Sequence, residues 1–165
     1  MAPGAQDLRR ERLADVRVRT ADANDTAFVI GLAGRFGETR AAWRSYDEVT
    51  TGTQRALAAA FASRPQTEAI FIAVNAAGDR LGFAYVVTHE DFFTTEKHGH
   101  LSEIATIADG SGAGPALMEA CEAWARDRGF RYLSLNVNDT NERAHAFYLR
   151  RDYQPEYRHL AKILR

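Results

Sequence analysis

The stretch whose residue types are best suited to do chemistry is glycine-rich and reads Asp109-Gly110-Ser111-Gly112-Ala113-Gly114-Pro115. It follows an apolar, strand-like run over 100–108 and precedes a segment with helical periodicity over 115–128. Glycine accepts a positive φ and lets a ligand approach the backbone closely. The start of the helix adds unpaired N–H groups and the positive end of the helix dipole. We therefore predict that this loop holds a pyrophosphate and that the rest of the chain brings a second substrate to it.

The composition limits the kinds of protein that can carry this loop. The chain has 165 residues, 45% of them hydrophobic and 26% charged, which is typical of one soluble globular domain. A formal net charge of −1 disfavours nucleic acid and an anionic membrane as partners. No apolar run is long enough to span a membrane, and the first 15 residues lack the apolar core of a secretory signal. The single cysteine, Cys121, fits a reducing compartment and a buried structural role, so we expect a cytoplasmic protein.

The periodicity predicts a single domain over 16–165, after a flexible tail over 1–15. Helices are expected over 26–36, 46–63, 115–128 and 141–151, the last with a capping-box start at Asp139 and Glu142. Strands are expected over 16–20, 69–74, 81–88, 100–108, 132–137 and 153–164. The resulting order is β-α-α-β-β-β-α-β-α-β, which predicts an α/β or α+β protein with a mixed sheet.

A second motif lies further along the chain and reads Asn141-Glu142-Arg143-Ala144-His145-Ala146-Phe147-Tyr148. It is followed by Asp152-Tyr153. Together with the element order, the two motifs resemble the acyl-CoA-dependent N-acetyltransferase superfamily (GNAT). In that family the first motif is Gln/Arg-x-x-Gly-x-Gly/Ala, and the second is Asn-x-x-Ala-x-x-x-Tyr followed by Gly-Phe. The resemblance covers 16–165 and implies a mostly antiparallel central sheet flanked by four helices.

The resemblance also implies an activity, a co-substrate and residue roles. The expected reaction is direct transfer of acetyl from acetyl-CoA to an amine of a small molecule, in a ternary complex and without a metal. Amides of Gly110, Ser111, Gly112, Ala113 and Gly114 would hold the pyrophosphate, and backbone near Ala105, Thr106 and Ile107 would bind the pantetheine arm. Asn141 would bond the cofactor arm, and Tyr148 would protonate the leaving thiolate. The other interpretation of Tyr148 is a core aromatic residue.

Several further side chains are candidates for the acceptor site. Glu103, within the strand before the glycine-rich loop, can act as general base directly or through a water; otherwise it is a solvent-facing strand residue. Phe36 and Trp43 either line the acceptor pocket or pack into the domain. Phe92 and Phe93 are not expected to be both exposed, so at least one should pack or line the cleft. Histidines and acids at 89–100 form either a polar loop or an acceptor rim, since their spacing matches no recognised metal-ligand pattern.

Two departures from the family pattern carry expectations of their own. Asp109 stands where the family has Gln or Arg, so its carboxylate either points away from the pyrophosphate or is offset by a neighbouring arginine. The segment between Thr106 and Gly110 is about two residues shorter than the family pattern, so the bulge that opens the fourth strand is expected to be altered. These departures favour a rival function, a non-catalytic acyl-CoA-binding or regulatory domain. A homodimer is compatible with the resemblance.

Overall fold

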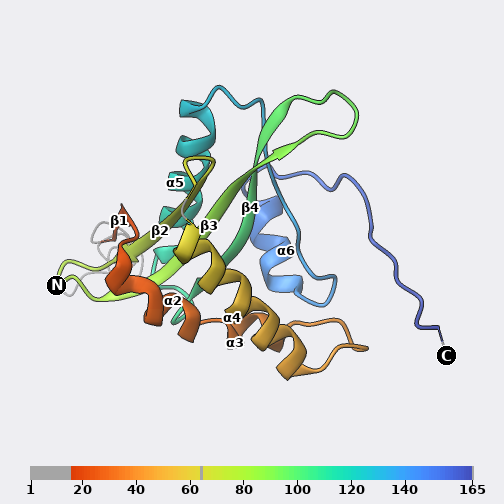
Figure 1. Ribbon diagram of the computed structural model, residues 1–165, viewed down its shortest axis with the longest axis horizontal. Helices are drawn as coiled ribbons and strands as arrows, with labels where there is room; N and C mark the ends of the chain where they lie inside the picture. The colour runs from red at the N-terminus through yellow and green to blue at the C-terminus, as the bar shows by residue number, and fades with distance from the viewer. Residues whose placement is uncertain (1–15, 64, 165) are drawn as a thin grey trace, which may run out of the picture.

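The structure of the chain, a computed structural model that describes residues 16–63 and 65–164, is a five-stranded sheet between two helical layers (Figure 1). The predicted tail over 1–15 lies outside the described residues. The strands are β1 (Arg17–Thr20), β2 (Glu68–Val74), β3 (Arg80–Glu90), β4 (Lys97–Thr106) and β5 (Leu133–Leu135). The helices are η1 (Ala23–Asp25), α2 (Thr26–Gly31), α3 (Gly34–Glu38), α4 (Tyr46–Ser63), α5 (Ala113–Asp127) and α6 (Glu142–Leu149).

The sheet has the strand order β1-β2-β3-β4-β5, and its first four strands are antiparallel. β5 is parallel to β4 and pairs with it at only three positions, Gly99 to Leu133, His100 to Ser134 and Leu101 to Leu135. The mixed, mostly antiparallel sheet predicted from the sequence is therefore confirmed.

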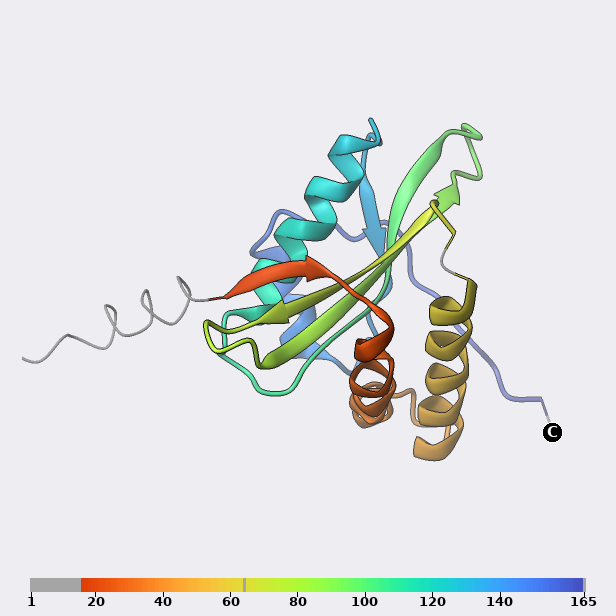
Figure 2. The ribbon, with the colours of Figure 1, turned by 60° about the vertical axis from the view of Figure 1, so that its left-hand side comes forward.

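Each face of the sheet is covered by its own helices and has its own core (Figure 2). On one face, Leu117, Met118 and Cys121 of α5 pack with Ala84 and Val86 of β3, and α6 adds to this core. On the other face, a separate set joins α2 and α4 to the sheet: Val29, Leu57, Ile72 and Phe83. Cys121 is fully buried, as its place on the apolar face of the helix predicted.

A bulge in β4 changes which side chains share a face. Tyr85 of β3 pairs with Glu103 and the next residue, Val86, pairs with Leu101, so Ser102 is the extra residue. Leu101 therefore lies in the α5 core, whereas Glu103 is on the opposite face with Tyr85 and Ala105. The simple alternation of the strand would have put Leu101 and Glu103 on the same face.

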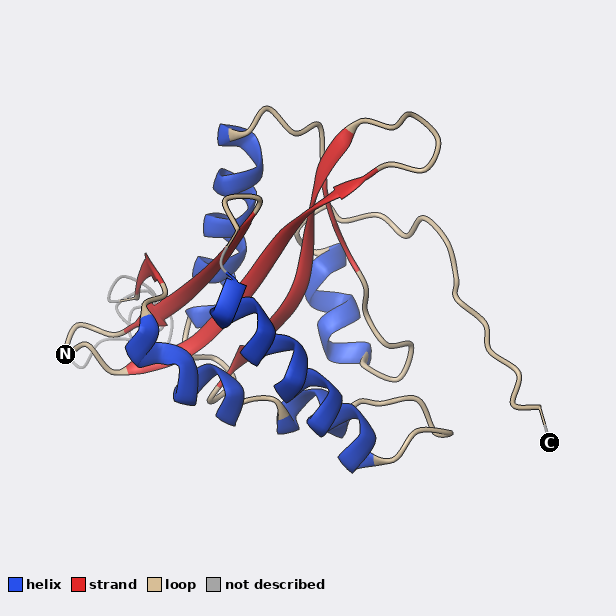
Figure 3. Cartoon of the chain, in the orientation of Figure 1, coloured by secondary structure: helices blue, strands red, loops and turns tan. Residues whose placement is uncertain are grey.

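Three expectations about elements were wrong in detail. The helix expected over 26–36 is divided into α2 and α3, and α3 lies so close to Tyr46 that a Cβ on Gly34 would be 2.5 Å from the Tyr46 hydroxyl oxygen. α6 is capped by Asn141 and not by Asp139. The strand expected over 153–164 is absent: this segment has no regular structure and runs away from the sheet (Figure 3). No helix within 16–63 and 65–164 has the length and apolar character needed to cross a membrane.

Candidate active site

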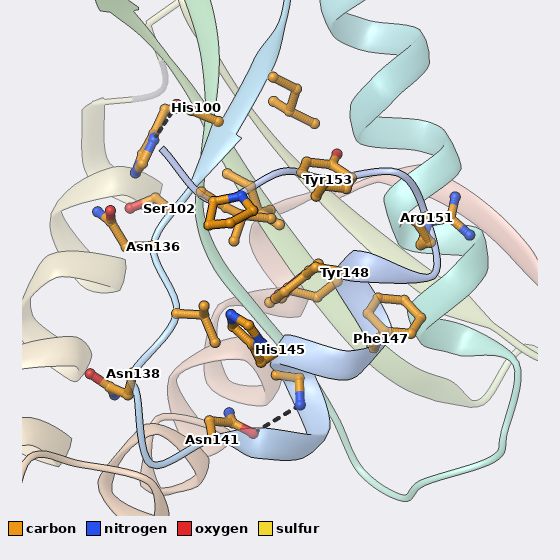
Figure 4. Close-up of a pocket in the computed structure, with 18 of the residues that line it drawn as sticks. His100, Ser102, Asn136, Asn138, Asn141, His145, Phe147, Tyr148, Arg151 and Tyr153 are labelled. Atoms are coloured by element: carbon orange, nitrogen blue, oxygen red, sulfur yellow. Dashed lines mark hydrogen bonds between the residues drawn. The ribbon is translucent and has the colours of Figure 1, made fainter. Parts of the chain in front are cut away.

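The candidate site is the wedge that opens where β4 and β5 separate. After Leu101 the two strands no longer pair, and the bulge at Ser102 begins at this point. The open side of β4 beyond the bulge faces α6 across a groove, in which polar side chains from three elements gather (Figure 4). The labelled lining residues are His100, Ser102, Asn136, Asn138, Asn141, His145, Phe147, Tyr148, Arg151 and Tyr153.

The glycine-rich loop forms one end of this groove. Gly110 and Gly112 have φ angles of 72° and 81°, a region that residues with side chains disfavour. Gly112 is the N-cap residue of α5, so no side chain of the N-cap occupies the helix start. α5 begins at Ala113, two residues earlier than predicted, so Pro115 lies in its first turn, where the missing N–H costs no hydrogen bond. A Cβ on Gly110 would meet no atom within 4 Å, so the loop backbone is open to a ligand. These features fit an anion such as a pyrophosphate.

Asp109, the unexpected acid of this loop, is paired with two arginines. Its carboxylate forms an ion pair with the guanidinium of Arg143 on α6, and Arg35 Nη2 of α3 lies 3.7 Å from its Oδ1. Of the two expectations for Asp109, the structure shows the second, in which neighbouring arginines offset its charge. Arg143 belongs to the second motif, so this ion pair connects the two motifs.

Tyr148 lies in the groove with its ring buried. The ring makes edge contacts with Phe147 and Tyr153, at centroid distances of 5.4 and 5.8 Å. Its hydroxyl makes no hydrogen bond within the described part of the chain. Burial raises the pKa of Tyr148 to about 12, and the nearby Cys121 contributes in the same direction. The hydroxyl is therefore protonated at neutral pH and able to donate a hydrogen bond to a ligand.

Asn141 has a structural role that limits what it can offer a cofactor. Its side-chain Oδ1 accepts a hydrogen bond of 3.1 Å from the N–H of Ala144 and so caps α6. The side-chain NH₂ group is the part left to bond a cofactor arm.

The strand residues predicted to contact the pantetheine arm differ in how available they are. Ala105 and Thr106 both line the groove, but Ala105 is largely buried and packs in the α4-side core, while Thr106 lies at the end of β4. The N–H of Ile107 donates to the carbonyl of Leu81 at 2.9 Å. The backbone carbonyl of Ile107 is thus the group left for a ligand. Thr106 pairs with β3 but not with β5, so its backbone edge on the β5 side is open beyond the bulge.

Glu103 lies beside the bulge but on the face opposite the α5 core. It is not one of the groove-lining residues, and its Oε2 is buried without a hydrogen-bond partner. Burial raises the pKa of the Glu103 carboxyl. A buried carboxylate oxygen without a partner is a position where a water or a ligand group would be stabilised. Its role as general base stays a prediction.

The aromatic residues proposed for acceptor binding fall into three situations. Phe36 packs edge-on against Phe83 in the α4-side core, at a centroid distance of 6.4 Å. Trp43 is partly exposed, with the guanidinium of Arg44 4.1 Å from its ring centroid. Phe92 and Phe93 are 90% and 83% exposed at the tip of the β3–β4 loop and contact each other. Neither phenylalanine packs into the domain, but both are among the residues that line the groove, as are Phe36 and Trp43, so their role in acceptor binding stays a prediction.

His100 belongs to the cluster for which the sequence predicted either a polar loop or an acceptor rim, and the structure puts it among the residues that line the groove. Its Nδ1 is 2.8 Å from the hydroxyl oxygen of Ser134, and the ring of His89 stacks on it at 4.4 Å. Burial, followed by the charges of His89 and His98, lowers the pKa of His100 to about 4, so this imidazole is neutral at pH 7. Ser102, Ser134 and Asn136 were overlooked, because nothing in the sequence marks where β4 and β5 separate. Among the described residues, no three His, Cys, Asp or Glu side chains are arranged to hold a metal ion.

A mixed, mostly antiparallel sheet with a splayed β4–β5 pair and a glycine-rich loop opening α5 is the arrangement of an acetyltransferase fold. The chain belongs to the acetyltransferase (GNAT) family, whose model matches residues 38–153. It is 37% identical over 83 residues to an aminoglycoside N(6')-acetyltransferase type 1 of Stenotrophomonas maltophilia. That match covers 47% of this chain and 54% of the relative, so it spans about half the length of each.

Solved structures show the same fold at low sequence identity. A protein from Pyrococcus furiosus, provisionally assigned as an acetyl transferase, superimposes with a TM-score of 0.74 at 22% identity, covering 91% of this chain and 100% of that one. An aminoglycoside antibiotic 6'-N-acetyltransferase of Acinetobacter baumannii gives a TM-score of 0.65 at 10% identity, with coverages of 91% and 98%. At these identities the similarity shows the fold alone.

Proposed function

We propose that the protein transfers an acetyl group from acetyl-CoA to an amine of a small molecule, within a ternary complex. The observation that carries this proposal is the placement of Tyr148, whose hydroxyl makes no hydrogen bond to the described residues, in the groove between the β4–β5 wedge and the glycine-rich loop. A binding module has no need of a proton donor at this point. The tyrosine therefore favours the enzyme over the rival, a non-catalytic acyl-CoA-binding domain.

The co-substrate supplies a thioester, and the residues of the chain have distinct tasks around it. Backbone amides of 110–114 bind the pyrophosphate, with Asp109 offset by Arg143 and Arg35. The open edge of β4 at Thr106, with the side-chain NH₂ of Asn141, binds the arm that carries the acetyl group. Tyr148 donates a proton to the departing sulfur, a transfer for which its protonated state at neutral pH is required.

The acceptor amine must lose a proton as the C–N bond forms and the C–S bond breaks. We assign this proton to Glu103 through a water, because its buried Oε2 lacks a partner and burial raises the pKa of its carboxyl toward that of an effective base. His100 is the second candidate, because it lines the groove and its imidazole is neutral at pH 7.

Aminoglycosides are the acceptor class to test first, because the Stenotrophomonas maltophilia relative carries that name. The experiment has two parts: thermal unfolding with and without acetyl-CoA, then release of free thiol over a panel of aminoglycosides, polyamines, amino acids and peptide amines. Stabilisation by acetyl-CoA and turnover on one class support the proposal. Stabilisation without turnover on any amine would leave only the binding domain, and no stabilisation at millimolar acetyl-CoA would refute both functions.

A further inference from the structure

Three titratable side chains form a row across the α4 side of the sheet, on three neighbouring strands: Glu68 of β2, Tyr85 of β3 and Glu103 of β4. Tyr85 pairs directly with Glu103, and the bulge at Ser102 gives Glu103 this position. Glu68 pairs with Val87, which lies two residues beyond Tyr85 and on the same face of β3. Tyr85 therefore stands between two carboxylates.

The single hydroxyl of this row serves only one of the two carboxylates. Tyr85 Oη donates a hydrogen bond of 2.5 Å to Glu68 Oε2. Glu103 Oε2 is buried and has no hydrogen-bond partner among the described residues. A phenol has one proton to donate, so the bond to Glu68 withholds that proton from Glu103.

The Tyr85 hydroxyl keeps its proton over the pH range of an enzyme assay. Burial, followed by the hydrogen bond to Glu68 and the charges of Glu68 and Glu103, raises the pKa of Tyr85 well above its usual range. The hydroxyl is thus a permanent donor, and the carboxylate to which it donates is the variable part of the row.

The other groups around Glu103 leave its buried oxygen dependent on this donor. Within the described residues no charged group contributes to the pKa of Glu103: burial raises it, and a hydrogen bond with Ser102 lowers it. His100, two pairing positions away on β4, is neutral at pH 7 and has its Nδ1 beside the Ser134 hydroxyl. The side chains that α4 adds to the core around Tyr85 are apolar, among them Leu57 and Ala60.

We propose that Glu68 is a positioning residue: by holding the Tyr85 hydroxyl, it keeps Glu103 free to take the proton of the acceptor amine. A hydrogen bond from Tyr85 would stabilise the charged form of Glu103 and make it a weaker base. In the reaction the C–N bond forms, the C–S bond breaks, and the amine proton moves through a water to Glu103, while Tyr85 and Glu68 exchange no proton. The catalytic part of this inference rests on the proposed function; the sharing of the hydroxyl does not.

The test removes the competing carboxylate and then the hydroxyl. In Glu68→Ala the hydroxyl loses its acceptor and turns to Glu103, so the pKa of the Glu103 carboxyl should fall by about 1 pH unit. In Glu68→Ala with Tyr85→Phe the donor is absent, and this pKa should return to the wild-type value. NMR of the side-chain carboxyl carbons measures it without acetyl-CoA or an amine, and Glu103→Gln identifies the signal. Glu119→Ala, at an exposed position of α5, is the control and should leave the pKa of Glu103 unchanged.

Two results of the NMR titration would overturn the proposal. One is a pKa of Glu103 that stays the same in Glu68→Ala. The other is a fall of equal size in the double variant, because it would come from a loosened sheet and not from the hydroxyl.

The pH profile of kcat tests the catalytic part on the same variants. Its acid limb should move to lower pH in Glu68→Ala, by the same about 1 pH unit, and return in the double variant. A limb that stays in place while the pKa of Glu103 falls would overturn the positioning role, because Glu103 would then not be the base. A wild-type protein without turnover on any amine would refute the proposed function, and the NMR titration would still decide how the hydroxyl is shared.

Discussion

Asp109 of the glycine-rich loop and Arg143 of α6 form an ion pair that joins the two motifs of the fold. Arg35 of α3 approaches the same carboxylate, so three elements meet at the loop. The guanidinium groups of Arg143 and Arg35, both paired with the Asp109 carboxylate, thus lie beside the open backbone amides of the loop. A phosphate bound at the loop would be attracted by the arginines and repelled by the aspartate, and this balance can be measured.

Asp109→Asn should strengthen binding of CoA. The substitution keeps the size of the side chain, removes its negative charge and leaves Arg143 and Arg35 free to interact with a phosphate. Asp109 is more than half exposed, so solvent screens the effect and a gain of about 3- to 10-fold in affinity is expected. Isothermal titration with CoA measures it. Asp127→Asn, the same change at the other end of α5, should leave the affinity unchanged. Equal affinity for Asp109→Asn and wild type would mean that the carboxylate lies outside the field of the phosphates.

Tyr148→Phe should lower kcat by about 10²-fold or more, with little change in KM for acetyl-CoA, because it removes the proton donor and keeps the ring packing. Thiol release under saturating substrates gives both constants. The matched control is Tyr153→Phe, since that ring contacts Tyr148 but its hydroxyl is directed to Glu122 at 3.4 Å. Wild-type turnover in Tyr148→Phe would mean that Tyr148 is a core aromatic residue and not the proton donor.

Glu103→Gln should lower kcat by about 10²-fold because the amide cannot accept the amine proton. The raised pKa of the Glu103 carboxyl allows a second, independent test of this role. The base must be ionised, so the wild-type kcat falls as the pH drops through this raised pKa, and the Gln variant should lack that step. Measuring kcat from pH 5 to 9 on both forms tests it.

His100→Gln is the comparison that decides between the two candidate bases. If Glu103 is the base, His100→Gln should reduce kcat by less than about 10-fold. A larger loss in His100→Gln, with Glu103→Gln close to wild type, would move the role to the imidazole, which lines the groove and is neutral at pH 7.

The parts of the fold that the sequence predicted are those in which short-range pattern decides the structure. The buried run of β2, the turn at Gly78 and the return strand β3 are encoded within about twenty residues. The glycine-rich loop was predictable because Gly110 and Gly112 adopt φ angles that other residues avoid. The second motif pointed to Tyr148 as a residue of interest. The periodicity of α6, which puts Tyr148 on the face turned toward the sheet, accounts for its burial.

The parts that the sequence did not predict depend on contacts between distant segments. The bulge at Ser102 exists only in the register of β4 against β3, so the face on which Glu103 lies could not be derived from alternation. The two arginines that pair with Asp109 are 74 and 34 residues away along the chain. Segment 153–164 was predicted as a strand, but a strand also requires a partner, and the described part of one chain supplies none.

Asp25 gives the last prediction, which concerns stability. Its side chain is fully buried and binds Arg19 through two hydrogen bonds of 2.7 and 2.9 Å and Arg80 through one of 2.7 Å, so it ties η1 to β1 and β3. Asp25→Asn leaves Arg80 without its ion-pair partner and leaves Arg19 with Asp22 alone, whose carboxylate is 3.9 Å away. A loss of about 3 kcal/mol in unfolding free energy at pH 7 is expected from the cost of breaking a buried ion pair. Urea unfolding measures it, and Asp139→Asn at an exposed loop position should change the free energy by less than about 0.5 kcal/mol.

The pH dependence of that loss separates the ion pair from a simple packing defect. Hydrogen bonds from Arg19 hold the pKa of Asp25 well below the value of about 3.9 that an aspartate has in the unfolded chain. Stability from this group is therefore fully present above about pH 5 and is lost as the pH falls toward the lowered folded-state pKa. The difference between wild type and Asp25→Asn should shrink as unfolding is repeated from pH 7 down to pH 3. A difference that stays constant over this range would mean that Asp25 stabilises the fold by its shape and not by its charge.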